Sequence, residues 1–226
     1  RIGAVIPCHK SEGEIGVTVC SLLRYLPPQN IIVSDNAGSQ SPPDDTEGVV
    51  RDIDPQVVYL YTSAPLKTLA MWNGLQQLPK GVEFVLHVDD DTVVPKDMVF
   101  DPAWFDDPAV SEVTYPIFTR HVNLLTEAIG LIFKTNAHHG LFHNVTSGTS
   151  LWAAGIIGLV RRHVLQTVLA DHVFLPFGED AFHGLLQLMN GYKIKRDARS
   201  NVVTFAPPVL GTFGCGTFSA RAQGYG

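Results

Sequence analysis

The sequence predicts an α/β fold in which a mostly parallel central sheet carries helices on both faces. In the first half of the chain, short apolar runs alternate with segments of helical periodicity. This order is typical of parallel strands joined by helical crossovers. Polar clusters follow three of the runs, which is where open parallel sheets bind ligands. The length of 226 residues is sufficient for one large domain with a substantial core.

The first half of the chain supplies the strands and helices that define this pattern. Ile2–Ile6 is a short apolar run that Pro7 ends, as expected of a buried strand. Apolar residues then recur at helical spacing from Ile15 to Leu26, where two prolines stop them. The remaining elements expected here are strands over 30–33, 57–61 and 84–88, a helix over 66–78, and a polar, proline-rich loop over 39–45.

The second half of the chain is less regular, and its elements are expected from shorter patterns. Apolar periodicity predicts helices over 124–133, 161–169 and 182–189. The expected strands cover 110–118, 192–194 and 202–205, and residues 151–160 form a buried apolar segment. Together with the first half, these elements indicate a mixed α/β domain rather than an all-helical or all-strand one.

Composition excludes several classes of partner. The chain has 16 Lys and Arg against 22 Asp and Glu, so its formal charge is −6. It contains no cluster of basic residues of the kind that binds a nucleic-acid backbone, and we expect no nucleic-acid partner. The longest apolar run is too short for a bilayer, which needs about 20 residues. Membrane contact is therefore expected only through segments outside this chain.

The cysteines do not predict a covalent or metal-bound framework. Cys8, Cys20 and Cys215 are odd in number and far apart in the sequence. Neither a disulfide pattern nor a zinc motif has this spacing. The histidines at 138, 139 and 143 lack a third ligand at a suitable distance, so a zinc site is not expected there either. His183 is interpreted as an ordinary helix residue.

Three consecutive aspartates, Asp89, Asp90 and Asp91, follow the strand expected over 84–88. Adjacent carboxylates repel one another unless a positive group lies among them. Alternate side chains of an extended segment point the same way, so Asp89 and Asp91 are expected to face one cleft, with Asp90 turned aside. Two such oxygen donors suit Mg²⁺ or Mn²⁺ on a phosphate-bearing substrate. An exposed acidic turn is the alternative.

A second acidic pair, Glu179 and Asp180, follows Gly178 directly before an expected helix. Acidic side chains are favourable at a helix N-terminus, so capping alone could explain the pair. A carboxylate held at a turn beside apolar residues is also a suitable general base for activating a hydroxyl group. The residues leave both interpretations open.

Four segments, taken in order, resemble the motifs of family 2 glycosyltransferases of the GT-A fold. They are Ile-Pro-Cys-His-Lys-Ser-Glu at 6–12, Val-Ser-Asp-Asn-Ala-Gly-Ser at 33–39, Val-Asp-Asp-Asp-Thr at 88–92 and Gly-Glu-Asp at 178–180. The sequence looks most similar to the processive chitin, hyaluronan and cellulose synthase-like enzymes. The resemblance implies one catalytic domain over 1–226, cut from a longer chain, with a nucleotide-binding half at 1–92 and an acceptor-binding half at 93–226.

The resemblance also implies roles for individual residues. Asp91, with Asp89, would hold the metal ion on the diphosphate, and Asp180 would be the catalytic base. A further group would contact the nucleotide sugar: Pro7, Glu12, Asp35, Lys67, Asp89 and Asp90. Glu179, Arg221 and Tyr225 would lie near the acceptor and the diphosphate. The processive enzymes carry a Q/R-x-x-R-W motif where this chain has Arg221-Ala-Gln-Gly-Tyr225, so an arginine and a tryptophan of that motif are replaced.

The implied activity is an inverting, metal-dependent transfer of a sugar from a nucleotide-diphospho-sugar, expected to be UDP-linked, to a saccharide acceptor. The expected cofactor is Mg²⁺ or Mn²⁺, and the expected location is the cytosolic face of a membrane. The alternatives are transfer of a single sugar to a lipid-linked or other acceptor, and a degenerate domain that binds nucleotide sugars without catalysis. A nucleotidyltransferase is disfavoured, because residues 7–13 contain only one Lys and one Gly.

Overall fold

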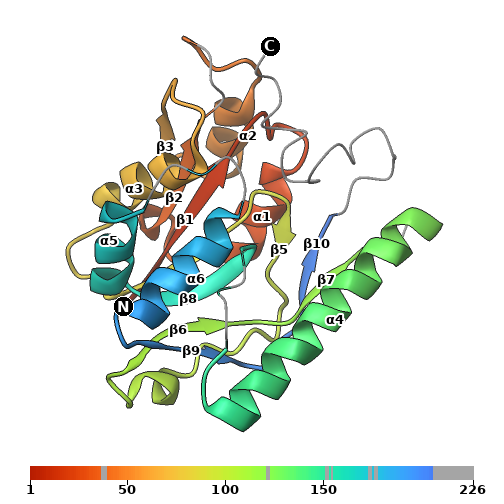
Figure 1. Cartoon of the computed structure of the whole chain (residues 1–226). Coiled ribbons are helices and arrows are strands. Elements are labelled where there is room, and N and C mark those ends of the chain that lie inside the picture. The colour runs from red at the N-terminus through yellow and green to blue at the C-terminus, as the bar shows by residue number, and fades with distance from the viewer. Residues whose placement is uncertain are drawn as a thin grey trace.

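A seven-stranded sheet forms the centre of the computed structural model (Figure 1), which describes residues 1–36, 40–120, 123–150, 153, 155–172, 175 and 178–205. The strand order is β3-β2-β1-β4-β8-β6-β9. The first four in this order are parallel to one another, whereas β8 runs antiparallel to both of its neighbours. The strands are β1 (Ile2–Cys8), β2 (Ile31–Asp35), β3 (Val58–Tyr61), β4 (Phe84–Val88), β6 (Val110–Thr114), β8 (Ile157–Arg161) and β9 (Lys193–Arg196).

Helices cover both faces of this sheet, and the alternation of side chains along each strand explains how. In β1, Ala4 and Ile6 belong to the core cluster that includes α1 (Ile15–Leu22). Val5, between them, belongs to the cluster on the opposite face, with α3 (Lys67–Gln77). Because successive residues of a strand point to opposite faces, a nearly continuous apolar strand buries both. The expected arrangement of a mostly parallel sheet between helices is confirmed.

The remaining helices and a small second sheet surround this core. The helices are α2 (Thr46–Ile53), α4 (Leu124–Ser147), α5 (Arg162–Ala170) and α6 (Glu179–Met189), with 3-10 turns η1 (Pro28–Asn30) and η2 (Pro102–Phe105). The second sheet has the order β5-β10-β7, formed by β5 (Thr92–Val93), β10 (Val202–Thr204) and β7 (Ile117–Thr119). Helix α4 lies along one side of the molecule, where it packs against β7 and β9 (Figure 1).

Several elements differ from the sequence-based expectation, and α1, for example, ends at Leu22 instead of Leu26. The segment expected as one strand over 110–118 forms two strands in different sheets; Pro116, between them, has no N–H group to donate to a ladder. Helix α4 continues to Ser147 instead of ending near 133; the Asn123 side chain caps its start, and Gly148 ends it with a φ of 74°. Helix α2 was not expected. It begins at Thr46, directly after the loop expected over 39–45.

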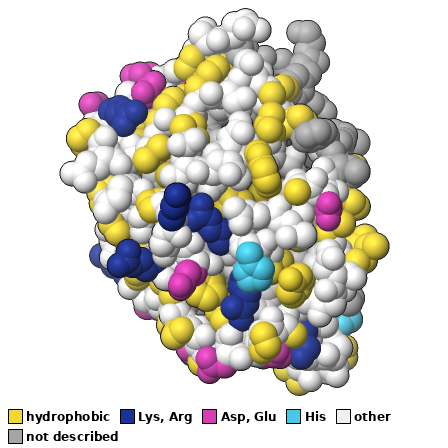
Figure 2. Space-filling model, turned by 90° about the vertical axis from the view of Figure 1, so that its left-hand side faces the viewer, with side chains coloured by type: hydrophobic (Ala, Val, Ile, Leu, Met, Phe, Trp, Pro, Cys, Tyr) yellow, Lys and Arg dark blue, Asp and Glu magenta, His cyan; other side chains and the backbone are white. Residues whose placement is uncertain are grey.

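On the face of the molecule seen in Figure 2, neither charged nor hydrophobic side chains form one large continuous patch. Figure 2 shows Lys and Arg side chains on this face interspersed with hydrophobic, acidic and uncharged ones. Among the helices that the structure describes, none combines the length and the apolar character that crossing a bilayer requires.

The close packing of α3 on the sheet gives a first prediction. A Cβ atom at Gly74 would lie 2.5 Å from Val5 Cγ1, so Gly74→Ala must push α3 away from β1. Overpacking outweighs the better helix propensity of alanine, and we expect the free energy of unfolding to fall by about 1–2 kcal/mol. Urea unfolding measures the effect, with Gly13→Ala as the control because nothing lies within 4 Å of that site. Equal midpoints for both variants would contradict the packing.

Candidate functional site

A pocket lies at the carboxyl ends of β1 and β4, and several of the residues singled out by sequence line it. Pro7, Lys67, Asp89, Glu179 and Asp180 all face this pocket. They come from β1, the first turn of α3, the residue after β4, and the first turn of α6. Parallel strands end at one edge of a sheet, and this common edge is what brings these distant segments together.

Lys67 lies at the centre of this group. Its Nζ atom is 2.7 Å from Asp89 Oδ1 and 3.4 Å from Glu179 Oε1, and it donates to the carbonyl oxygen of Gly155 at 3.3 Å. Burial lowers the pKa of Lys67, but Asp89, Glu179 and Asp180 together raise it by more. The ammonium group therefore stays charged and links α3 to β4 and α6.

The surroundings of Asp89 disfavour its ionised form in spite of the nearby Lys67. Burial raises its pKa to about 7 although Lys67 lowers it, because Asp91 and Asp90 add to the effect of burial. A carboxyl group held in this way gains from a further positive charge nearby. Oxygen donors with excess negative charge, next to an open pocket, fit a hard divalent cation such as Mg²⁺ or Mn²⁺.

The three aspartates contact three different parts of the fold. Asp89 pairs with Lys67, Asp90 accepts a hydrogen bond from the Ser11 hydroxyl, and Asp91 Oδ1 accepts one from Thr204 Oγ1 at 3.0 Å. Asp90 is thus turned away from the pocket, toward the β1–α1 loop. Asp91 does not line the pocket as Asp89 does, but points toward β10 of the second sheet. It is nevertheless close enough to raise the pKa of Asp89.

Asp180 lies in the first turn of α6, where the positive end of the helix dipole favours a carboxylate. The backbone N–H of Ala181 donates to its Oδ1 atom at 2.8 Å. A Cβ atom at Gly155 would overlap Asp180 Oδ2, so the missing side chain at Gly155 makes room for this carboxylate. Asp180 is therefore held at the pocket by its helix and by the glycine opposite it.

Asp35 and Glu12, which the resemblance also implies, lie outside the lining of the pocket. Asp35, at the end of β2, is fully buried, and its Oδ2 atom accepts from the Tyr59 hydroxyl at 2.8 Å. Burial and this carboxylate both raise the pKa of Tyr59. Glu12 is exposed, and its Oε2 atom accepts from the backbone N–H of Asp45, just before α2. Arg221 and Tyr225 lie outside the described residues.

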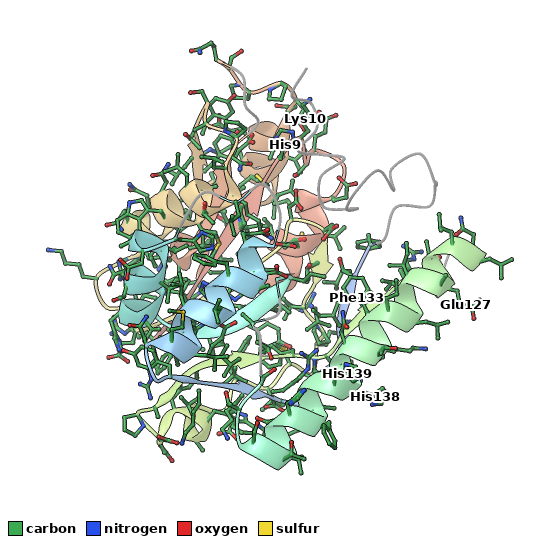
Figure 3. All side chains as sticks on the ribbon, in the orientation of Figure 1. His9, Lys10, Glu127, Phe133, His138 and His139 are labelled. Atoms are coloured by element: carbon green, nitrogen blue, oxygen red, sulfur yellow. The ribbon has the colours of Figure 1, made fainter. Side chains whose placement is uncertain are left out.

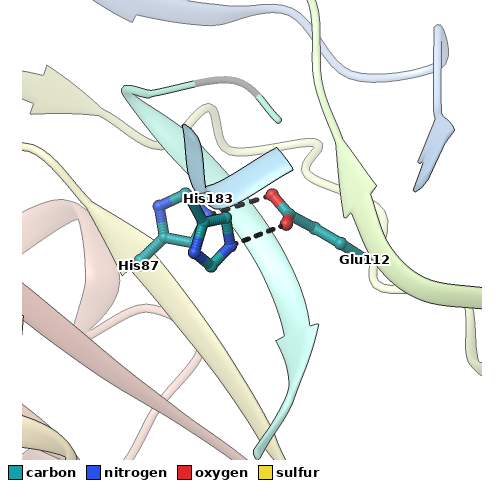
Figure 4. Close-up of side chains that lie close together, drawn as sticks. All are labelled: His87, Glu112 and His183. Atoms are coloured by element: carbon teal, nitrogen blue, oxygen red, sulfur yellow. Dashed lines mark hydrogen bonds and ion pairs between the residues drawn. The ribbon is translucent and has the colours of Figure 1, made fainter. Parts of the chain in front are cut away.

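A buried cluster of His87, Glu112 and His183 borders the same pocket and was not foreseen (Figure 4). His87 Nε2 is 3.2 Å from Glu112 Oε1, and His183 Nε2 is 3.1 Å from Glu112 Oε2. Burial raises the pKa of Glu112, but its hydrogen bonds with both histidines lower it by more, and it falls well below its usual range. His183 lies in α6 as expected, and its contact with Glu112 is the feature that the sequence did not reveal.

Sequence signals for this cluster existed. Glu112 is a charged residue between Val110 and Val113 of an expected strand, and a buried charge requires partners. By contrast, His138 and His139 lie exposed on α4 (Figure 3), and the metal-binding group that converges among the described residues does not include them.

The ion pair at the pocket gives a second prediction. Lys67→Met leaves Asp89 and Glu179 without their cation, and we expect the free energy of unfolding to fall by about 1–3 kcal/mol. The control is Lys193→Met, which removes an exposed pair with Asp107 at 3.0 Å and should shift the urea midpoint much less. Equal shifts for the two variants would show that Lys67 has no special structural role.

Comparison with solved structures identifies proteins that share this fold. No family model and no curated protein matches the sequence. Among solved structures, S. aureus TarS 1–349 in complex with UDP-GlcNAc superposes with a TM-score of 0.65 at 16% identity, covering 96% of this chain and 61% of that one. The mannosyltransferase PcManGT from Pyrobaculum calidifontis, in complex with GDP-Man and Mn²⁺, gives 0.62 at 17% identity, covering 98% and 60%.

The longer TarS structure gives a TM-score of 0.62 at 18% identity, with 92% of this chain and 37% of that chain covered. This chain thus spans about 60% or less of the length of these proteins. The likeness extends over nearly all of this chain at low sequence identity. The chain therefore has the GT-A fold of these glycosyltransferases.

Proposed function

We propose that the chain is an inverting, metal-dependent glycosyltransferase of the family 2 type, which transfers a sugar from a UDP-linked donor to a saccharide acceptor in polysaccharide synthesis. The observation that carries the proposal is the convergence of Lys67, Asp89, Glu179 and Asp180 on one pocket. This pocket lies at the carboxyl ends of the parallel strands, where α/β sheets bind ligands. Solved structures of the same fold contain UDP-GlcNAc or GDP-Man.

The donor side of the proposed site is the strand edge. Asp89 and Asp91 would hold Mg²⁺ or Mn²⁺, which offsets the charge of the leaving nucleoside diphosphate. The Lys67 ammonium group lies beside Asp89 and is placed to contact a phosphate oxygen. The nucleotide would occupy the edge of the 1–92 half, bounded by Pro7, Glu12, Asp35 and Asp90.

The acceptor side is the pocket wall formed by α6. Asp180 would remove the proton from the acceptor hydroxyl as its oxygen attacks the anomeric carbon. A carboxylate fixed by its helix terminus loses little freedom in this role. Glu179 shares Lys67 with Asp89, so it connects the two sides of the pocket. The 93–226 half, including Arg221 and Tyr225, would bind the acceptor.

The role of Asp91 is testable by binding alone. In Asp91→Ala, we expect the affinity for UDP in the presence of Mn²⁺ to fall to the value without metal, because a metal ligand is lost. Isothermal titration calorimetry with and without Mn²⁺ measures this. Asp97→Ala, an exposed aspartate nearby, is the control. A wild-type protein that binds UDP equally with and without Mn²⁺ would contradict the proposed donor site.

The role of Asp180 separates chemistry from binding. In Asp180→Asn, we expect the turnover rate to fall by about 10²–10⁴-fold, the usual contribution of a general base, with UDP affinity in Mn²⁺ unchanged. The rate is measured as the release of nucleotide from a series of UDP- and GDP-sugars. Asp171→Asn, exposed at the end of α5, is the control. Undiminished turnover in Asp180→Asn would exclude this residue as the base.

A further inference from the structure

We propose that His87, Glu112 and His183 form a zinc site, separate from the donor-bound cation, in the wall of the pocket. The three side chains come from β4, β6 and α6, so no local sequence motif connects them. Each is at least nine-tenths buried. One potential ligand atom from each lies within 4.8 Å of the others. Two imidazoles and one carboxylate are a common protein ligand set for zinc.

The nitrogen–oxygen distances in the cluster are close to those of a zinc site, with His87 facing Oε1 and His183 facing Oε2 of Glu112. In a tetrahedral site with bonds of roughly 2.0–2.1 Å, neighbouring ligand atoms are about 3.3 Å apart. The two separations between imidazole nitrogen and carboxylate oxygen are 3.2 and 3.1 Å. Zinc would take the place of the hydrogen bonds that the two imidazoles now make to Glu112.

Charge favours a cation at this point. Glu112 is fully buried, and a buried carboxylate needs a compensating positive charge. The described groups that hydrogen-bond it are the two imidazoles and the Gln187 amide, none of which carries a fixed positive charge. A divalent ion supplies that charge.

The surroundings support a built site. The Gln187 amide donates to Glu112 Oε2, and the Ser111 hydroxyl donates to Gln187 Oε1 at 2.5 Å, so the carboxylate is oriented from behind. A Cβ atom at Gly158, on the strand between β4 and β6, would overlap both Glu112 Oε1 and His87 Nε2. His87 and His183 also line the pocket, from which an ion could reach the cluster.

The ligand chemistry distinguishes this site from the donor cation. Imidazole nitrogen prefers zinc and its transition-metal neighbours, whereas the aspartate oxygens at 89 and 91 suit Mg²⁺ or Mn²⁺. The two sites are nevertheless adjacent in sequence and in space. His87 precedes Asp89 by two residues, and His183 follows Asp180 by about one helical turn. Zinc would therefore tie the strand that carries Asp89 to the helix that carries Asp180.

The test is metal content and binding, independent of transferase activity. Protein stripped with a chelator, then given zinc and desalted, should retain about one zinc per chain by mass spectrometry. Co²⁺ titration should give visible d–d absorption, and X-ray absorption of the zinc form should show two imidazoles with oxygen. His183→Ala should weaken zinc binding by more than the 10–100-fold typical of an outer-shell change. Asp91→Ala should leave it unchanged.

Matched controls make the outcome decisive. His139→Ala removes an exposed histidine on α4 that could hold zinc adventitiously with His143; it should not alter binding. The proposal would be overturned if His139→Ala lost zinc while His183→Ala kept it. It would also be overturned if the wild-type protein retained no zinc. The wild-type absorption spectra decide the matter even if His183→Ala fails to fold. A protein that binds zinc but transfers no sugar would support this inference and contradict the proposed function. A protein that transfers sugar but retains no zinc would do the reverse.

Discussion

The Lys67 ammonium group lies among three acidic side chains that reach it from separate parts of the chain. Asp89 follows β4, and Glu179 and Asp180 begin α6. Without a central cation, carboxylates brought this close would repel one another and disfavour the closed arrangement of strand edge and helix. The pairing at 2.7 Å to Asp89 thus allows an acidic pocket to exist in the folded protein. It also leaves a positive group where an anionic ligand would enter.

Two glycines on one segment make room for the carboxylates that border this pocket. Gly155 leaves space for Asp180, and Gly158 leaves space for Glu112 where its side chain meets His87. Between them, Ile156 and Ile157 are buried in the core cluster. The segment is therefore held in place by its buried apolar residues, while its glycines leave space for acidic side chains from α6 and from the neighbouring strand β6.

Two buried acids of this region have partners of different kinds. At Asp89 the partner is a lysine with a permanent charge, and excess negative charge remains. At Glu112 the partners are imidazoles and an amide, whose charge depends on protons or on a bound ion. The first arrangement suits a site that exchanges an anionic ligand and a hard cation. The second suits a more permanent, nitrogen-bound ion.

Local patterns along the chain predicted the fold class and several of the residues that line the pocket. Apolar runs such as 84–88 matched the strand bounds because a buried parallel strand is apolar on both faces. The acids at 89 and 180 could be singled out because charged residues at element ends carry a local signal. Only the tertiary structure decided which partners they meet. Asp91 turned toward Thr204 of a later strand, and Glu112 paired with two histidines far away in sequence. Such pairings depend on strand order and helix placement, which local patterns do not encode.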